Sequence, residues 1–222
     1  MKLFSLDSPL GKAIALLADL CILNLLFFLS CVPIFTIGTS CAALYDTVQA
    51  LLTQDATGVS RTFFTAFGRN FKKGTALFLI SLAFGAFVVV DLVCATQLGQ
   101  VMAVLCFGVI LATSYFYFAT LALAPMTLIR SEKEDKILDI IKGSFLNAIK
   151  AGWRPLVAVA LNLLPFVLFF FSPALFMQTW MFWFLVGFAI TAYLNNWLLL
   201  KAVDPVVWND VKPAKREKKE KK

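Results

Sequence analysis

The sequence predicts an all-α protein, a bundle of helices that crosses a membrane several times. Three observations predict it: a very apolar composition, a series of apolar stretches long enough to span a bilayer, and basic residues confined to segments between pairs of these stretches. Hydrophobic residues make up 60% of the 222 residues, against roughly 45–50% in an average soluble domain. A water-soluble fold of this size cannot bury so much apolar surface, whereas in a membrane the apolar side chains can remain exposed to lipid.

Six stretches are candidate spans, because a bilayer core about 30 Å thick needs about 20 mostly apolar residues in a helix. Five of them meet this requirement easily. The stretch Ile34–Gln54 is weaker because it carries polar residues, among them Thr36 and Asp46. In chain order the six are Ala13–Val32, Ile34–Gln54, Thr75–Ala95, Val101–Ile129, Pro155–Pro173 and Gln178–Leu200.

The distribution of positive charge favours a span at Ile34–Gln54. Basic residues concentrate in the short cytoplasmic loops of membrane proteins. If this stretch spans, every basic segment is cytoplasmic; if it does not, five spans remain and the first basic segment lies opposite the others. We therefore expect six spans in three hairpins, with both termini on the cytoplasmic side of the plasma membrane. The 20 Lys and Arg residues fall within 1–12, 55–74, 130–154 and 201–222, and the uncharged links lie near Pro33, at 96–100 and at 172–177.

Two of the basic segments contain amphipathic patterns typical of cytoplasmic helices that lie in the plane of the membrane. In Arg61–Lys73, phenylalanines at helical spacing share one face, and basic side chains that attract anionic lipid share the other. The alternative is that the apolar face packs against the bundle or a partner, since amphipathicity does not identify what covers a face. The apolar side chains are Phe63, Phe64, Phe67 and Phe71, and the basic ones are Arg61, Arg69, Lys72 and Lys73.

The second amphipathic helix is expected at Asp135–Lys150. Apolar side chains recur there at every fourth residue, with charged side chains opposite them. Ser131 and Glu134 have the spacing of a capping box, which predicts where this helix begins. The apolar series is Ile137, Ile141, Phe145 and Ile149, and the opposite face carries Lys136, Asp139 and Lys150.

The remaining composition narrows the classes of function. The chain has no histidine, which excludes His-based catalytic triads and His–metal sites. Its five cysteines lie in apolar stretches without a Cys-x-x-Cys pair and behave as small hydrophobes, so no metal, cofactor or catalytic residue is expected. The basic residues that give the net charge of +7 all lie in the segments outside the spans, which indicates a membrane and no nucleic acid. Residues 1–210 are expected to form one transmembrane domain, and the lysine-rich residues 211–222 a disordered cytoplasmic tail.

Ionisable residues inside a span are costly, which makes them candidates for function. Asp19 and Asp46 lie at similar depth, about 10–12 Å from the cytoplasmic ends of adjacent helices. They can face a shared polar cavity for a cation, a proton or sugar hydroxyls, supported by Asn24, Asn195 and Asn196. The alternative is that these side chains only stabilise helix packing, as polar contacts between membrane helices commonly do. A third reading pairs the two carboxylates as in an intramembrane aspartyl protease, but the Gly-x-Gly-Asp element of that family is absent.

A series of short motifs follows the chain in order: Asp7-Ser8-Pro9-Leu10, Ala18-Asp19-Leu20, Asn24-Leu25-Leu26, Val32-Pro33-Ile34, Arg61-x-Phe63-Phe64, Asn70-Phe71-Lys72 and Tyr193-Leu194-Asn195-Asn196-Trp197. This series closely resembles that of the YesL-like family of bacterial membrane proteins. The resemblance extends over almost the whole chain and is most specific over residues 6–73. One departure is Phe27-Phe28, where the family commonly has Trp.

The resemblance implies an integral membrane protein of a family whose molecular function is unknown. Members are often encoded beside carbohydrate-uptake systems, an association that implies no mechanism. We therefore expect an accessory or regulatory role in carbohydrate uptake without enzymatic activity, and the candidate partners are the lipid bilayer, a sugar permease and a second copy of the chain. A small-solute transporter or channel that uses Asp19 and Asp46 is the alternative, and an intramembrane enzyme is a more distant one.

Overall fold

The computed structural model describes residues 9–95, 97, 100–131 and 134–211. Every regular element in these ranges is helical, which confirms the predicted all-α class. The elements are α1 (Pro9–Cys31), η1 (Ile34–Thr36), α2 (Ile37–Thr53), α3 (Val59–Ala95), α4 (Gln100–Arg130), α5 (Ile137–Ala151), α6 (Arg154–Phe171), α7 (Pro173–Phe182), η2 (Trp183–Gly187), α8 (Phe188–Val203) and α9 (Pro205–Val211).

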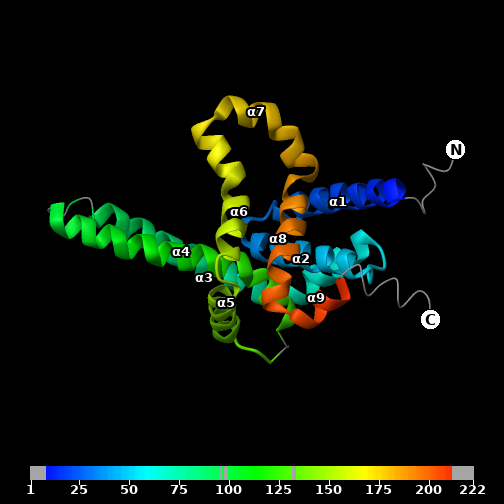
Figure 1. The fold of residues 1–222 in the computed structure, drawn as a ribbon, viewed down its shortest axis with the longest axis horizontal. Coiled ribbons are helices and arrows are strands. Elements are labelled where there is room, and N and C mark those ends of the chain that lie inside the picture. The colour runs from blue at the N-terminus through cyan, green and yellow to red at the C-terminus, as the bar shows by residue number, and fades with distance from the viewer. Residues whose placement is uncertain (1–8, 96, 98–99, 132–133, 212–222) are drawn as a thin grey trace.

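Five helical segments are long and apolar enough to cross a bilayer, by length and composition alone. The helix α2 is not one of them, because it has 17 residues and carries the polar side chains of the weakest predicted span. It nonetheless follows α1 through a tight turn and packs against it, so the two form a hairpin (Figure 1). The five segments are Leu10–Cys31, Val59–Ala95, Phe107–Arg130, Arg154–Phe171 and Pro173–Lys201.

The turn between α1 and α2 is closed by side-chain hydroxyls. The Thr36 Oγ1 atom donates to the carbonyl oxygens of Ser30 and Pro33, both at 2.6 Å. The Ser40 Oγ atom donates to the Thr36 carbonyl at 2.9 Å. The Ser30 carbonyl lies in the last turn of α1, where carbonyl groups have no partner inside the helix, so the Thr36 hydroxyl satisfies a group that the reversal exposes. The polar residues that weaken this stretch as a span therefore help to form its turn.

The helix α3 corrects one predicted boundary. The segment Arg61–Lys73 was expected to be an interfacial helix separate from the span at Thr75–Ala95, but both belong to one helix of 37 residues. Gly74, at the expected junction, is buried against α2 and has helical geometry. A small residue here lets the two helices approach closely, so the chain needs no break.

Three further boundaries differ from the prediction. The link expected at 172–177 shrinks to Ser172, because α7 begins at Pro173, where a proline is well placed as the first residue of a helix. The expected capping box at Ser131 is wrong: Asp139 Oδ2 instead accepts a hydrogen bond from the Lys136 backbone N–H at 3.3 Å. The short helix α9 was not predicted. Of the predicted tail 211–222, Val211 ends α9 and residues 212–222 lie outside the described residues.

The three hairpins extend from a shared centre in different directions (Figure 1). The α3–α4 hairpin extends to the left of the view, the hairpin made by α6, α7 and α8 extends upward, and α1 with α2 lies to the right. The apolar core lies where they meet, and α2 is central to it through its contacts with α1, α3, α4 and α8. Its fully buried side chains include Leu23, Val48, Phe63, Leu123, Met126 and Leu199.

Candidate functional site

Asn24, one of the predicted site residues, is fully buried and bound to a distorted turn of another helix. The segment Trp183–Gly187 is a π-helical turn, which displaces backbone groups from their usual partners. The Asn24 Nδ2 atom donates to the carbonyl oxygens of Trp183 at 3.0 Å and Phe184 at 2.7 Å. Its Oδ1 atom accepts from the Ala189 N–H at 2.9 Å. Asn24 therefore satisfies two carbonyl groups of this turn and the Ala189 N–H of α8, and it has a structural role.

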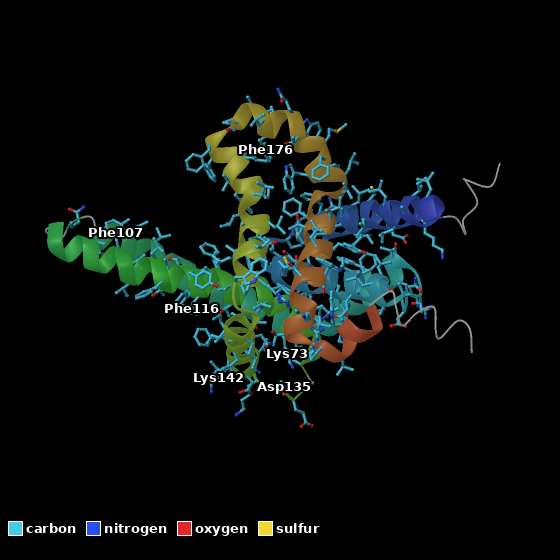
Figure 2. All side chains as sticks on the ribbon, in the orientation of Figure 1. Lys73, Phe107, Phe116, Asp135, Lys142 and Phe176 are labelled. Carbon is cyan, nitrogen blue, oxygen red and sulfur yellow. The ribbon has the colours of Figure 1, made fainter. Side chains whose placement is uncertain are left out.

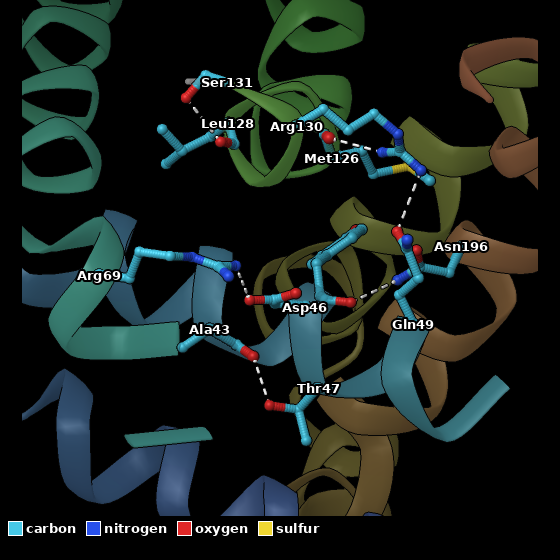
Figure 3. A network of polar contacts seen from close by, with 11 residues as sticks. Ala43, Asp46, Thr47, Gln49, Arg69, Met126, Leu128, Arg130, Ser131 and Asn196 are labelled. Carbon is cyan, nitrogen blue, oxygen red and sulfur yellow. Dashed lines mark hydrogen bonds and ion pairs between the residues drawn. The ribbon is translucent and has the colours of Figure 1, made fainter. Parts of the chain in front are cut away.

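Asp46 is half-buried on α2 and forms an ion pair with Arg69 of α3 (Figure 3). The pair joins a carboxylate from the weakest predicted span to a guanidinium from the predicted lipid-facing basic face. Burying a carboxylate is costly unless a cation accompanies it, and Arg69 supplies that cation. Sequence reasoning did not pair these two residues because they lie on different helices.

Arg130, at the end of α4, connects three parts of the chain and was not predicted as a site residue. Its Nη2 atom donates to Gln49 Oε1 of α2 at 3.1 Å, and its Nε atom donates to Asp204 Oδ2 at 3.0 Å. Its Nη1 atom donates to the Met126 carbonyl of its own helix at 2.7 Å. Figure 3 shows the contacts with Gln49 and Met126. Arg130 thus fixes the ends of α2, α4 and α8 relative to one another.

Asp204 also begins α9. Its Oδ1 atom accepts hydrogen bonds from the backbone N–H groups of Val206 and Val207, both at 3.1 Å, which is the role of a helix cap. Partial burial raises the pKa of Asp204, but the Val207 N–H, the Arg130 guanidinium and the Val206 N–H together outweigh it. The net effect is a pKa below the usual aspartate value, so the carboxylate is charged in the folded protein.

Asn195 and Asn196 of α8 lie in a second polar cluster, with Tyr45 of α2 and Asn162 of α6. The Asn195 Nδ2 atom donates to Tyr45 Oη and to Asn162 Oδ1, both at 3.0 Å. The Asn196 Nδ2 atom donates to the carbonyl oxygens of Tyr45 at 3.3 Å and Ala192 at 3.2 Å. Both asparagines are fully buried. Their Oδ1 atoms have no hydrogen-bond partner.

The predicted polar site is therefore divided between separate surroundings. Asn24 binds the π-helical turn, Asp46 binds Arg69, and only Asn195 and Asn196 share a cluster. Asp19 is half-buried on α1, and no polar contact joins it to the other four in the described part of the chain. No described contact supports a cavity that Asp19 and Asp46 share.

The predicted basic face of Arg61–Lys73 is also divided. Arg61 and Lys72 are exposed, whereas Arg69 binds Asp46 and the half-buried Lys73 donates to Ser131 Oγ at 3.4 Å. On the apolar side, Phe63 is fully buried and Phe67 half-buried, while Phe64 and Phe71 are exposed. Part of this face packs against the bundle, which was the alternative prediction, and part remains uncovered.

The helix α5 buries a different face from the expected one. Its buried residues are Ile140, Ser144, Ala148 and Ala151, while Phe145 and Ile149 of the expected apolar series are exposed. Small side chains let α5 lie close to α4, and Phe145 contacts the Phe116 ring of α4 at a centroid distance of 5.4 Å. Lys142 points away from the bundle (Figure 2). The outer surface of α5 thus combines exposed apolar and basic side chains.

An open recess lies at the junction of α4, α5 and α8, next to Arg130. It is lined by Thr127, Arg130, Ser131, Asp135, Asp139, Ile140, Asn147 and Val203. Among the residues that the structure describes, no group of His, Cys, Asp and Glu is arranged to hold a metal ion. Cys21, Cys31, Cys41 and Cys94 are free thiols.

Residues 20–92 match the family model described as "Protein of unknown function, DUF624". This is the family that YesL-like proteins belong to. The match extends from the middle of α1 to near the end of α3 and thus includes Asn24 of α1, Asp46 of α2 and Arg69 of α3. No curated protein and no solved structure shows significant similarity to the chain.

Proposed function

We propose that this chain is a YesL-like protein of the plasma membrane that serves carbohydrate uptake as an accessory or regulatory subunit, without enzymatic activity. The carbohydrate context comes from the family resemblance. One structural observation favours an accessory role: Asp46, a carboxylate that a transport mechanism would use, is bound to Arg69. The interior polar groups mostly bond one helix to another, while apolar and basic side chains on α3 and α5 remain exposed.

The surface that would contact a partner is the outer face of α5 and the adjoining start of α6. Leu138, Leu146, Ile149 and Trp153 are more than half exposed there, and Lys142 and Lys150 lie beside them. With 15 residues, α5 is shorter than the roughly 20 residues that cross a bilayer. Such a face suits either the headgroup region of anionic lipid or the cytoplasmic loop of a permease. We propose the permease as the functional partner and the lipid as its surroundings.

The orientation is part of the proposal. In Figure 1, α1 begins at the right of the view and α5 lies at the bottom, whereas the α3–α4 and α6–α7 tips lie at the left and top. This arrangement is compatible with one cytoplasmic side that carries all the basic segments. Both termini would then lie in the cytoplasm.

Affinity purification of the tagged full chain from native membranes tests the proposal. We expect a sugar-permease subunit to co-purify in a fixed ratio, and the double variant Leu146→Ser/Ile149→Ser to lose it. Val206→Ser, which changes a still more exposed apolar residue on α9, should retain the partner. Recovery of the chain without any permease under mild detergent would contradict the accessory role.

Transport through Asp19 and Asp46 is the second candidate, although no described contact favours it. In proteoliposomes with a proton or sodium gradient, a transporter would move solute, and Asp46→Asn would abolish uptake. We expect no uptake by the wild-type chain alone. Solute movement that depends on Asp19 or Asp46 would reverse this ranking.

A further inference from the structure

The amide of Asn196 is oriented by its surroundings. Its Nδ2 atom donates to two backbone carbonyl oxygens, those of Tyr45 and Ala192. Rotating the amide by half a turn would bring Asn196 Oδ1 against these two oxygens, with no hydrogen atom between them. The Oδ1 atom must therefore lie on the other side, where it is fully buried and has no donor in the protein.

A buried carbonyl oxygen without a donor costs about 1–3 kcal/mol, and buried polar groups in folded proteins are almost always satisfied. The neighbouring Asn195 Oδ1 atom lacks a donor as well, while the Nδ2 atoms of both amides are in use. Asn196 Oδ1 is thus a buried acceptor whose donor is not a group of the protein. A small group that satisfies this oxygen must donate a hydrogen bond or carry positive charge.

We propose that a buried water molecule binds at Asn196 Oδ1, in the polar cluster between α2 and α8, and donates a hydrogen bond to it. A water molecule fits this role because buried waters typically bridge polar groups that the protein leaves unsatisfied. A monovalent cation fits less well. No carboxylate makes a described contact with either asparagine, and Asp46, the sequence neighbour of their partner Tyr45, is already bound to Arg69.

Hydroxyl-radical footprinting of the full chain in nanodiscs tests the proposal, because radicals formed from bound water modify adjacent buried side chains. Tyr45 is the reporter, since its carbonyl oxygen and its hydroxyl contact Asn196 and Asn195 respectively. Phe63, a fully buried aromatic residue in the same core, is the dry reference. After normalisation to the free amino acids, we expect Tyr45 to be labelled severalfold more than Phe63. Equal labelling of the two would overturn the proposal.

A variant identifies the source of the labelling. Asn196→Leu removes the oxygen and should reduce Tyr45 labelling to the level of Phe63. Thr191→Val also removes a buried polar group of α8, but a hydroxyl that bonds only to the Gly187 carbonyl four residues earlier, and should leave Tyr45 labelling unchanged. Unchanged labelling in Asn196→Leu would contradict the site. The melting temperature in sodium or potassium is compared with that in N-methylglucamine. If sodium or potassium raises it for the wild-type chain but not for Asn196→Leu, the site binds a cation and the proposal of a bound water is overturned.

Discussion

Gly38 of α2 lies directly against the backbone of Gly74 of α3. A Cβ atom added at Gly38 would come within 2.3 Å of the Gly74 carbonyl oxygen, and one added at Gly74 would come within 2.8 Å of Thr39 Cα. The crossing is also bonded, because Thr39 Oγ1 donates to the Phe71 carbonyl at 3.1 Å. The contact between α2 and α3 is therefore set by two glycines, as is common where membrane helices pack closely.

Alanine at either glycine should separate α2 from α3. We expect Gly38→Ala and Gly74→Ala each to destabilise the protein by about 1–3 kcal/mol, the usual cost of overpacking. Gly108→Ala is the matched control, because nothing lies within 4 Å of the added methyl group and alanine favours the helix. Melting temperatures in detergent measure all three. A melting temperature of Gly38→Ala no lower than that of Gly108→Ala would contradict this close crossing.

Asn24→Leu should be strongly destabilising. The change leaves the carbonyl groups of Trp183 and Phe184 and the Ala189 N–H without their partner, at a cost of about 1–3 kcal/mol for each group that stays buried and unsatisfied. Thr179→Val removes a hydroxyl that only bonds within its own helix and should change the melting temperature little. Equal melting temperatures for the two variants would mean that Asn24 does not hold the π-helical turn.

The ion pair between Asp46 and Arg69 should be structural. A double-mutant cycle with Asp46→Asn and Arg69→Gln should give a coupling of about 1 kcal/mol or less, because Arg69 is half exposed and water screens it. The charge-reversed variant Asp46→Arg/Arg69→Asp should recover stability relative to either single reversal. If the single variants leave stability intact but abolish co-purification or transport, the pair is functional.

Acid should weaken the contact between Arg130 and Asp204. The folded-state pKa of Asp204 lies below its unfolded value of about 3.9, so its contribution is fully present above that pH. As the pH falls through the lower, folded-state pKa, the carboxylate is protonated and the contribution is lost. The stability difference between wild type and Asp204→Asn should shrink across this range. A difference that does not depend on pH would contradict the assigned roles of Asp204.

The sequence predicts the spans well because their signal is local. Apolar length alone locates α1, α4 and α6 to within a few residues. The continuity of α3 could not be read in the same way: Lys72 and Lys73 predict a membrane boundary, and a helix can continue through such a predicted boundary without a break. The face that α5 buries is shifted by one residue from the predicted one. Ser144 and Ala148 are buried, while larger apolar side chains of the predicted face remain exposed.

The candidate site was predictable only as a list of residues. Polar groups within spans identify Asn24, Asp46, Asn195 and Asn196, and all of them make specific contacts. Their partners depend on tertiary structure. The π-helical turn that Asn24 satisfies has no sequence signal. Arg130 lies in a basic segment between spans, where its sequence does not distinguish it from the other Lys and Arg residues that indicate the cytoplasmic side.

Accessibility of single cysteines in intact cells tests the membrane arrangement most directly. In a cysteine-free background, Ser5→Cys and Thr65→Cys are probed with a membrane-impermeant thiol reagent, with Ala174→Cys as the external reference. The proposed topology predicts that positions 5 and 65 are both protected until the cells are opened and that position 174 is labelled from outside. Labelling of position 5 and position 65 from opposite sides would contradict the shared cytoplasmic side on which the proposed function depends.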